Sequence, residues 1–116
     1  MVGRTGRIAT RAGFVALRRQ GLRARRGLVT VVRAPADATF PAAHRPCLAF
    51  AVSAGAGGAV VRNRIRRRLR AVFAALDPDP GWYLVSAGSA AAVAPHGELC
   101  ADLGAALRAV GGLGDP

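Results

Sequence analysis

The chain has 116 residues, of which 17 are arginine and none is lysine, and its formal net charge is +11. A chain of this length forms one domain with one modest core. So large a positive charge on a small domain favours a polyanionic partner, with nucleic acid ahead of an anionic membrane surface. The sequence has no run of about 18 apolar residues, and Met1–Phe14 lacks the apolar centre of a signal peptide. We therefore expect a cytoplasmic protein without a membrane span.

The basic residues are concentrated in the first part of the chain. Residues 1–70 hold 16 arginines against the single acid Asp37, whereas residues 71–116 hold Arg108 against five acids. The guanidinium group pairs with phosphate through two parallel hydrogen bonds and stacks on bases. The polyanion-binding surface is therefore expected within residues 1–70.

The first elements are a tail and a short helix. Residues 1–7 are rich in glycine and arginine and are expected to be a flexible basic tail. Thr10 is a suitable N-cap for a helix from Arg11 to about Gln20, in which Phe14 and Leu17 form a narrow apolar face.

Two main strands follow, with a possible third at the edge. Leu22–Arg26 is a basic segment that favours a short edge strand, and the β-branched run Gly27–Arg33 predicts a strand. Residues 34–46 contain three prolines and predict a loop. Cys47–Ser53 alternates larger apolar residues with alanine and predicts the second main strand.

The clearest element is a long helix from about Ala59 to Leu76, which follows a glycine-rich turn at 54–58. One face of this helix is apolar at helical spacing. Its members are Val61, Ile65, Leu69, Val72, Phe73 and Leu76. The prolines and glycine of Asp77–Gly81 end the helix.

The last part of the chain predicts a strand, a helix and a tail. Trp82–Ser86 has the composition of a strand, residues 87–94 give no clear preference, and 95–110 has helical apolar spacing. Residues 111–116 are expected to be a flexible tail. The order of elements predicts an α+β two-layer sandwich with helices on one face of a small sheet.

The long helix also carries the densest positive charge. Six arginines lie within Arg62–Arg70, with no acid among them. Such a helix repels itself, and a bound phosphate backbone would relieve the repulsion. The alternative is a charged face that is merely solvated, and the absence of interleaved acids argues against it.

At this segment the chain resembles the bacterial ribonuclease P protein family. The family pattern is an alanine-valine step, then Arg-Asn-Arg, then a basic helix. The matching residues are Ala59, Val60, Arg62, Asn63, Arg64, Ile65, Arg67, Leu69, Arg70 and Phe73. Phe14 followed by Gly21, the strand ending at Val52-Ser53, and Trp82–Val85 keep the family's order, so the resemblance spans about residues 7–110.

The resemblance implies an αβββαβα sandwich over residues 8–110, with a small mixed sheet and a left-handed crossover at the Arg-Asn-Arg helix. It implies that this helix contacts the catalytic RNA of the enzyme. In this sequence the contact falls on Arg62, Asn63, Arg64, Arg66, Arg67, Arg68 and Arg70. It also implies a cleft for the 5′ leader of precursor tRNA between the first helix and the sheet, which falls on Arg11, Phe14 and Arg18.

The resemblance further implies a protein subunit of an endoribonuclease that matures the 5′ ends of tRNA. Cleavage would be performed by the RNA subunit with Mg²⁺, so we expect no catalytic residue, metal site or cofactor on the protein itself. The expected partners are the catalytic RNA and precursor tRNA, with no membrane and no protein partner.

Other readings of the sequence remain weaker. A ribosomal or general structural RNA-binding protein is the main alternative, and a DNA-binding module lacks helix-turn-helix spacing. The glycines of 55–58 lack the lysine of a nucleotide-binding loop, and His44 with Cys47 does not complete a metal site. His96 is expected to be a loop residue, and Cys47 and Cys100 are expected to be reduced thiols in apolar surroundings.

Overall fold

The computed structural model of the protein describes residues 6–7, 17, 21–35 and 45–114. The elements in chain order are β1 (Gly6–Arg7), β2 (Leu22–Arg26), β3 (Val29–Pro35), β4 (Pro46–Ala51), η1 (Ala54–Ala56), α2 (Ala59–Leu76), β5 (Gly81–Ala87), η2 (Ser89–Ala92) and α3 (His96–Ala109). The predicted helix Arg11–Gln20 lies outside the described residues except for Leu17, which is helical and buried.

The five strands form one mixed sheet in the order β1-β4-β5-β3-β2. β2 and β3 are an antiparallel hairpin, and Gly27 in its turn has φ 54°, a left-handed conformation that glycine adopts without strain. β3 pairs antiparallel with β5, while β4 runs parallel to β5 from the pair Pro46 and Gly81 to the pair Ala51 and Ser86. The basic segment Leu22–Arg26 is therefore an edge strand, as its composition predicts.

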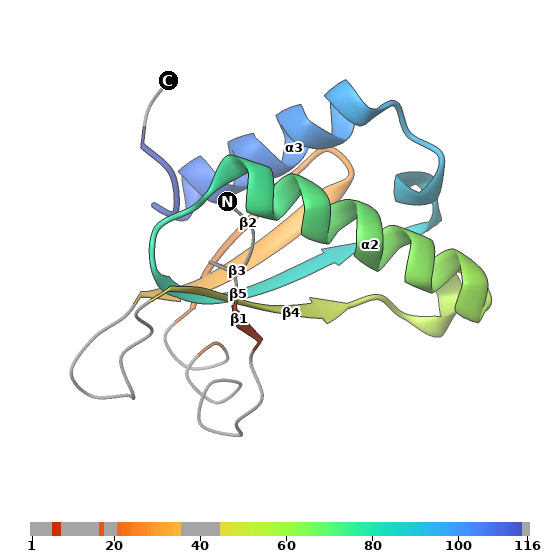
Figure 1. Ribbon diagram of the computed structural model, residues 1–116, viewed down its shortest axis with the longest axis horizontal. Helices are drawn as coiled ribbons and strands as arrows, with labels where there is room; N and C mark the ends of the chain where they lie inside the picture. Colours follow the sequence, from red (N-terminus) through yellow and green to blue (C-terminus); the bar gives the residue numbers. More distant parts are fainter. Residues whose placement is uncertain (1–5, 8–16, 18–20, 36–44, 115–116) are drawn as a thin grey trace.

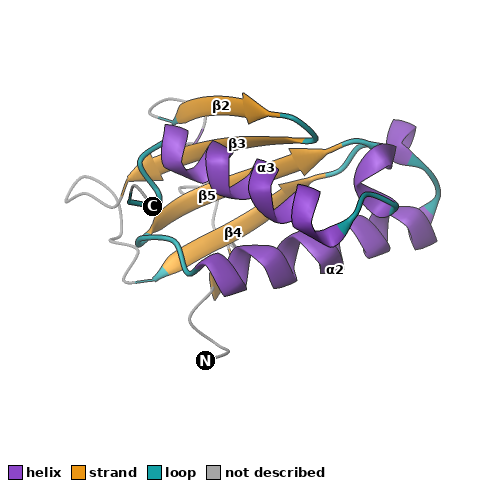
Figure 2. Ribbon diagram, turned by 90° about the horizontal axis from the view of Figure 1, so that it is seen from above, coloured by secondary structure: helices purple, strands orange, loops and turns teal. Residues whose placement is uncertain are grey.

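Both long helices cover the same face of the sheet, and the main core lies between the two layers (Figure 1, Figure 2). The largest fully buried side chains are Tyr83, Phe73, Ile65, Leu69, Leu99, Leu103, Leu107, Val29, Val31, Val72, Val85 and Val110. The opposite, open face of the sheet carries a smaller cluster formed by Leu17, Ala34, Cys47 and Trp82. The fold is thus the predicted two-layer α+β sandwich.

α2 connects the neighbouring parallel strands β4 and β5, and it runs antiparallel to both of them. Seen with the helices toward the viewer and the two strands pointing right, β5 lies above β4, so the crossover is left-handed (Figure 2). About 98% of such connections are right-handed. The crossover therefore agrees with the unusual handedness that the family resemblance implies.

α2 begins and ends at the residues that the sequence predicts. The helix starts after Gly58, whose carbonyl accepts a hydrogen bond from the Arg62 amide at 3.0 Å. It ends at Asp77, which adopts the left-handed conformation with φ 48° and donates its amide to the Phe73 and Ala74 carbonyls. Pro78 follows directly and cannot continue the helical hydrogen bonds.

Both predicted tails are wrong in part. Residues 1–7 are predicted to be flexible, yet Gly6 and Arg7 form β1 and pair in parallel with Cys47 and Leu48 of β4. Residues 111–116 are predicted to be flexible, yet the Gly112 amide donates to the Leu107 carbonyl and the Gly112 carbonyl accepts from the Asp79 amide, both at 2.8 Å. In both places backbone hydrogen bonds to distant residues, which side-chain patterns do not reveal, hold the chain to the domain.

The apolar stripe of α2 gives a direct test of the core. Leu69 is fully buried and Val60, on the same helix, is 80% exposed. Leu69→Ala should lower the free energy of unfolding by about 2–5 kcal/mol, because it leaves a cavity between helix and sheet. Val60→Ala is the matched control and should change it by less than about 0.5 kcal/mol. Urea unfolding of both variants measures the difference, and equal losses would contradict the placement of the stripe.

Candidate nucleic-acid interface

The outward side of α2 carries a dense group of basic side chains. Arg64, Arg67 and Arg70 are exposed together with Asn63, while Arg62, Arg66 and Arg68 are half-buried. This division follows from the buried stripe, because residues opposite the stripe on a helix must face solvent. The seven predicted RNA contacts are therefore all on the one helix, but they are not equivalent.

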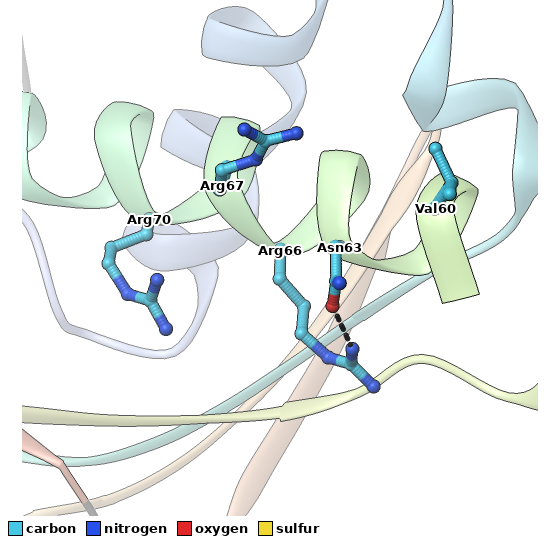
Figure 3. A pocket seen from close by; sticks show the side chains of 5 residues that line it. All are labelled: Val60, Asn63, Arg66, Arg67 and Arg70. Atoms are coloured by element: carbon cyan, nitrogen blue, oxygen red, sulfur yellow. Dashed lines mark hydrogen bonds between the residues drawn. The ribbon is translucent and has the colours of Figure 1, made fainter.

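Five residues of α2 line a shallow pocket of about 450 Å³, which we call the outer pocket. They are Val60, Asn63, Arg66, Arg67 and Arg70. Figure 3 shows Arg66 and Arg70 extending to one side of the helix and Arg67 to the other. The Arg66 guanidinium donates to Asn63 Oδ1 at 3.0 Å, so the asparagine of the Arg-Asn-Arg pattern orients a neighbouring arginine (Figure 3).

Two arginines of α2, Arg70 and Arg68, make contacts with other elements of the protein. The Arg70 guanidinium lies 5.3 Å from the centre of the Phe50 ring on β4, a cation–π arrangement that restrains its stem. Arg68 donates hydrogen bonds to the Ala91 carbonyl at 2.7 Å and to the Ala94 carbonyl. Arg68 therefore holds the η2–α3 connection against α2, a role that its position in the charged run does not reveal.

The positive charge of α2 is not neutralised within the described part of the chain. None of its arginines forms an ion pair with a described carboxylate. Among the described residues their guanidinium groups donate hydrogen bonds to Asn63 and to the carbonyls of Ala91 and Ala94, all of which are neutral. Arginine has donors but no acceptor. The outer pocket consequently suits an anion with several acceptor oxygens, such as a phosphate group, and does not suit a metal ion.

The open face of the sheet forms a second candidate surface. A groove of about 500 Å³, the open-face groove, is lined by Leu17, Gly21, Arg23, Val32, Phe50, Ala51 and Leu84. The predicted leader-binding residues Arg11, Phe14 and Arg18 lie outside the described residues. The groove adds residues that sequence reasoning missed, although strand alternation places Val32 and Leu84 on the face opposite the buried Val31 and Val85.

Neither described cysteine forms a disulfide or metal site. Burial raises the pKa of the Cys47 thiol above its ordinary value, and nearby Arg45 opposes this shift only partly. The thiol therefore stays protonated and unreactive at neutral pH. No group of three or more potential metal ligands occurs among the described residues. The described helices also include none with the length and apolar character of a membrane crossing.

The fold and the unneutralised arginine helix define a small α+β protein with a strongly basic helical surface. A family model described as Ribonuclease P matches residues 2–111, and the chain belongs to this family. It is 39% identical to the ribonuclease P protein component of Streptomyces avermitilis over 97% of this chain and 98% of the relative. It is 47% identical to the Micrococcus luteus protein component over 64% of this chain, a match that spans 59% of that relative.

Solved structures share the fold. The ribonuclease P protein of Staphylococcus aureus superimposes with a TM-score of 0.75 at 21% identity, covering 93% of this chain and 97% of the other. The ribonuclease P protein of Thermotoga maritima gives a TM-score of 0.71 at 16% identity, covering 88% of this chain and 94% of the other. At these identities the likeness concerns the fold alone.

Alanine variants of Arg68 and Arg64 should distinguish an arginine that supports the fold from one that is only exposed. Arg68→Ala leaves two backbone carbonyls without their donor and should lower the free energy of unfolding by about 1–3 kcal/mol. Arg64→Ala removes an exposed side chain and should change it by less than about 0.5 kcal/mol. Thermal and urea unfolding would measure the stability of both variants. If the Arg68→Ala protein were as stable as the Arg64→Ala protein, the hydrogen bonds of Arg68 to Ala91 and Ala94 would not contribute to stability.

Proposed function

We propose that the chain is the protein subunit of a bacterial ribonuclease P and that it acts in the cytoplasm to support 5′ maturation of tRNA. The observation that carries the proposal is the ordered helix α2, whose exposed arginines have no described carboxylate partner, in a chain that belongs to this family. The arginines would bind phosphates of the catalytic RNA and thereby hold the protein on it.

The RNA subunit would perform the cleavage. The described basic surface offers guanidinium donors, which repel a divalent cation, so Mg²⁺ would be held by the RNA and its substrate rather than by α2. The protein would contribute by lowering the repulsion between RNA phosphates where substrate and catalytic RNA meet. Its role is positional and electrostatic, and no protein side chain takes part in bond cleavage.

The open-face groove would receive the 5′ leader of precursor tRNA. Its centre is apolar, with Leu17, Val32 and Leu84, and Arg23 of the edge strand lies at its rim. Single-stranded RNA binds to positively charged grooves in which bases stack on aromatic side chains, and Phe50 supplies an aromatic ring to the lining of this groove. The leader and the catalytic RNA would thus occupy opposite faces of the sheet layer.

The direct test is reconstitution with the cognate catalytic RNA and a precursor tRNA. The protein should restore cleavage at low magnesium and bind the catalytic RNA more tightly than ribosomal RNA or duplex DNA. Equal affinity for all three nucleic acids, with no gain in cleavage, would favour the alternative of a general structural RNA-binding protein.

Affinity for the catalytic RNA should fall steeply with salt, because phosphate contacts release counterions. Arg67→Ala should reduce the slope of log affinity against log salt by about 1. Arg108→Ala is the matched control, since Arg108 is exposed at the far end of α3 and donates to the Gly114 carbonyl at 3.3 Å. Filter binding over a salt series measures both slopes. A shallow slope for the unchanged protein, or equal effects of the two variants, would count against the proposed interface.

Two arginines of β2 test the leader site. Arg23 lines the open-face groove, whereas Arg26 has the opposite strand parity and therefore points to the other face. Arg23→Ala should raise KM for precursor tRNA with a long leader about threefold to tenfold and leave KM for a one-nucleotide leader unchanged. Arg26→Ala should alter neither value. A loss that is independent of leader length would place the leader elsewhere.

A further inference from the structure

A second basic depression lies where α2 meets the start of α3. It has a volume of about 340 Å³ and is lined by Arg64, Arg67, Arg68, Ala71 and His96, and we call it the side notch. Three of the five lining residues are arginines and one is histidine, while none is acidic. The arginines come from α2 and the histidine from the first turn of α3, so the notch exists only because the fold brings these elements together.

The wall of the side notch is held in place by Arg68. Its hydrogen bonds to the carbonyls of Ala91 and Ala94 tie down the chain that leads into α3. Two residues after Ala94, His96 begins α3. His96 therefore lines the side notch, together with Arg64 and Arg67, from the start of a helix whose preceding chain is anchored.

The His96 ring is itself oriented. Its Nε2 atom lies 3.3 Å from the sulfur of Cys100, one helical turn further along α3. Within the described part of the chain no partner is found for the other ring nitrogen, Nδ1. Glu98 lies in the same first turn of α3 but does not line the notch. An oriented imidazole beside exposed guanidinium groups is suited to hydrogen bonding with an anion.

Arg67 connects the two depressions, because it lines both the outer pocket and the side notch. We propose that the side notch binds a phosphodiester group of the catalytic RNA, so that the RNA strand crosses α2 at Arg67 and reaches His96 on α3. This inference rests on the proposed function and adds to it a contact outside the Arg-Asn-Arg helix. The proposed contact also means that the RNA strand runs across α2 rather than along its axis.

A double-mutant cycle tests this path with the complete protein and the catalytic RNA. Of these two depressions, Arg64 and His96 line the side notch and not the outer pocket, whereas Arg70 lines the outer pocket and not the side notch. Arg64→Ala and His96→Ala should each weaken binding about threefold to tenfold at fixed salt. If both contact one phosphate, the double variant should bind at least about threefold better than the product of the two single losses predicts. The pair Arg64→Ala and Arg70→Ala should be additive, because these residues line different depressions.

The controls separate failure of this inference from failure of the proposed function. Arg108→Ala removes a basic side chain from the other end of α3 and should leave the affinity unchanged. His96 is exposed, so His96→Ala should retain the unfolding temperature of the unchanged protein. If the unchanged protein binds the catalytic RNA and Arg70→Ala weakens it, but His96→Ala has no effect or is additive with Arg64→Ala, the side-notch path is overturned while the subunit role stands. If the unchanged protein does not bind the catalytic RNA, the proposed function itself fails.

Discussion

The burial of one face of α2 against the sheet is the constraint on which the other features depend. Ile65, Leu69 and Phe73 have no exposed surface, and this fixes the rotation of the helix about its axis. This rotation leaves Arg64, Arg67 and Arg70 exposed, and none of them has a described carboxylate partner. Burial of the apolar stripe thus stabilises α2 against the repulsion between its arginines, which would disfavour the same helix in isolation.

The left-handed crossover places this charged helix along the β4 side of the sheet, and α3 packs on β2 and β3 on the same sheet face (Figure 2). One sheet face is therefore covered, and the open face remains for a second ligand beside Leu17. With α2 and α3 side by side, the charged surface of α2 extends to the first turn of α3 at His96. The two proposed RNA-binding surfaces both follow from the placement of the two long helices on the same face of the sheet.

Arginine has more than one role in this lysine-free chain. Arg33 donates to the Val110 carbonyl at 3.3 Å and the Pro80 carbonyl at 3.2 Å, and its guanidinium lies 5.7 Å from the centre of the Tyr83 ring. Burial raises the pKa of Tyr83, and Arg33 opposes this shift. Like Arg68, Arg33 serves as a structural brace, so the count of arginines overstates the charge available to RNA.

The sequence predicts the elements that depend on local patterns. The bounds of α2 agree with its apolar period and its Asp-Pro stop, and the edge position of β2 agrees with its charge. The sequence does not predict β1, the packed segment 111–114 or the hydrogen bonds of Arg68 to Ala91 and Ala94. It also does not predict that His96 and Arg64 line one depression. Each of these features depends on contacts between residues far apart in the chain, and the local sequence around a residue does not reveal such contacts.

Arginine side-chain NMR during titration with the catalytic RNA tests the central claim most directly. The Nε–Hε resonances of Arg64, Arg67 and Arg70 should shift or broaden at the first additions of RNA, because their guanidinium groups would meet phosphate. The Nε–Hε resonances of Arg33, whose terminal guanidinium nitrogens bind backbone carbonyls, and of Arg108, at the far end of α3, should stay in place until saturation. Uniform changes across all arginines, or changes confined to residues outside α2, would contradict the claim that the packed arginine helix is the RNA-binding surface.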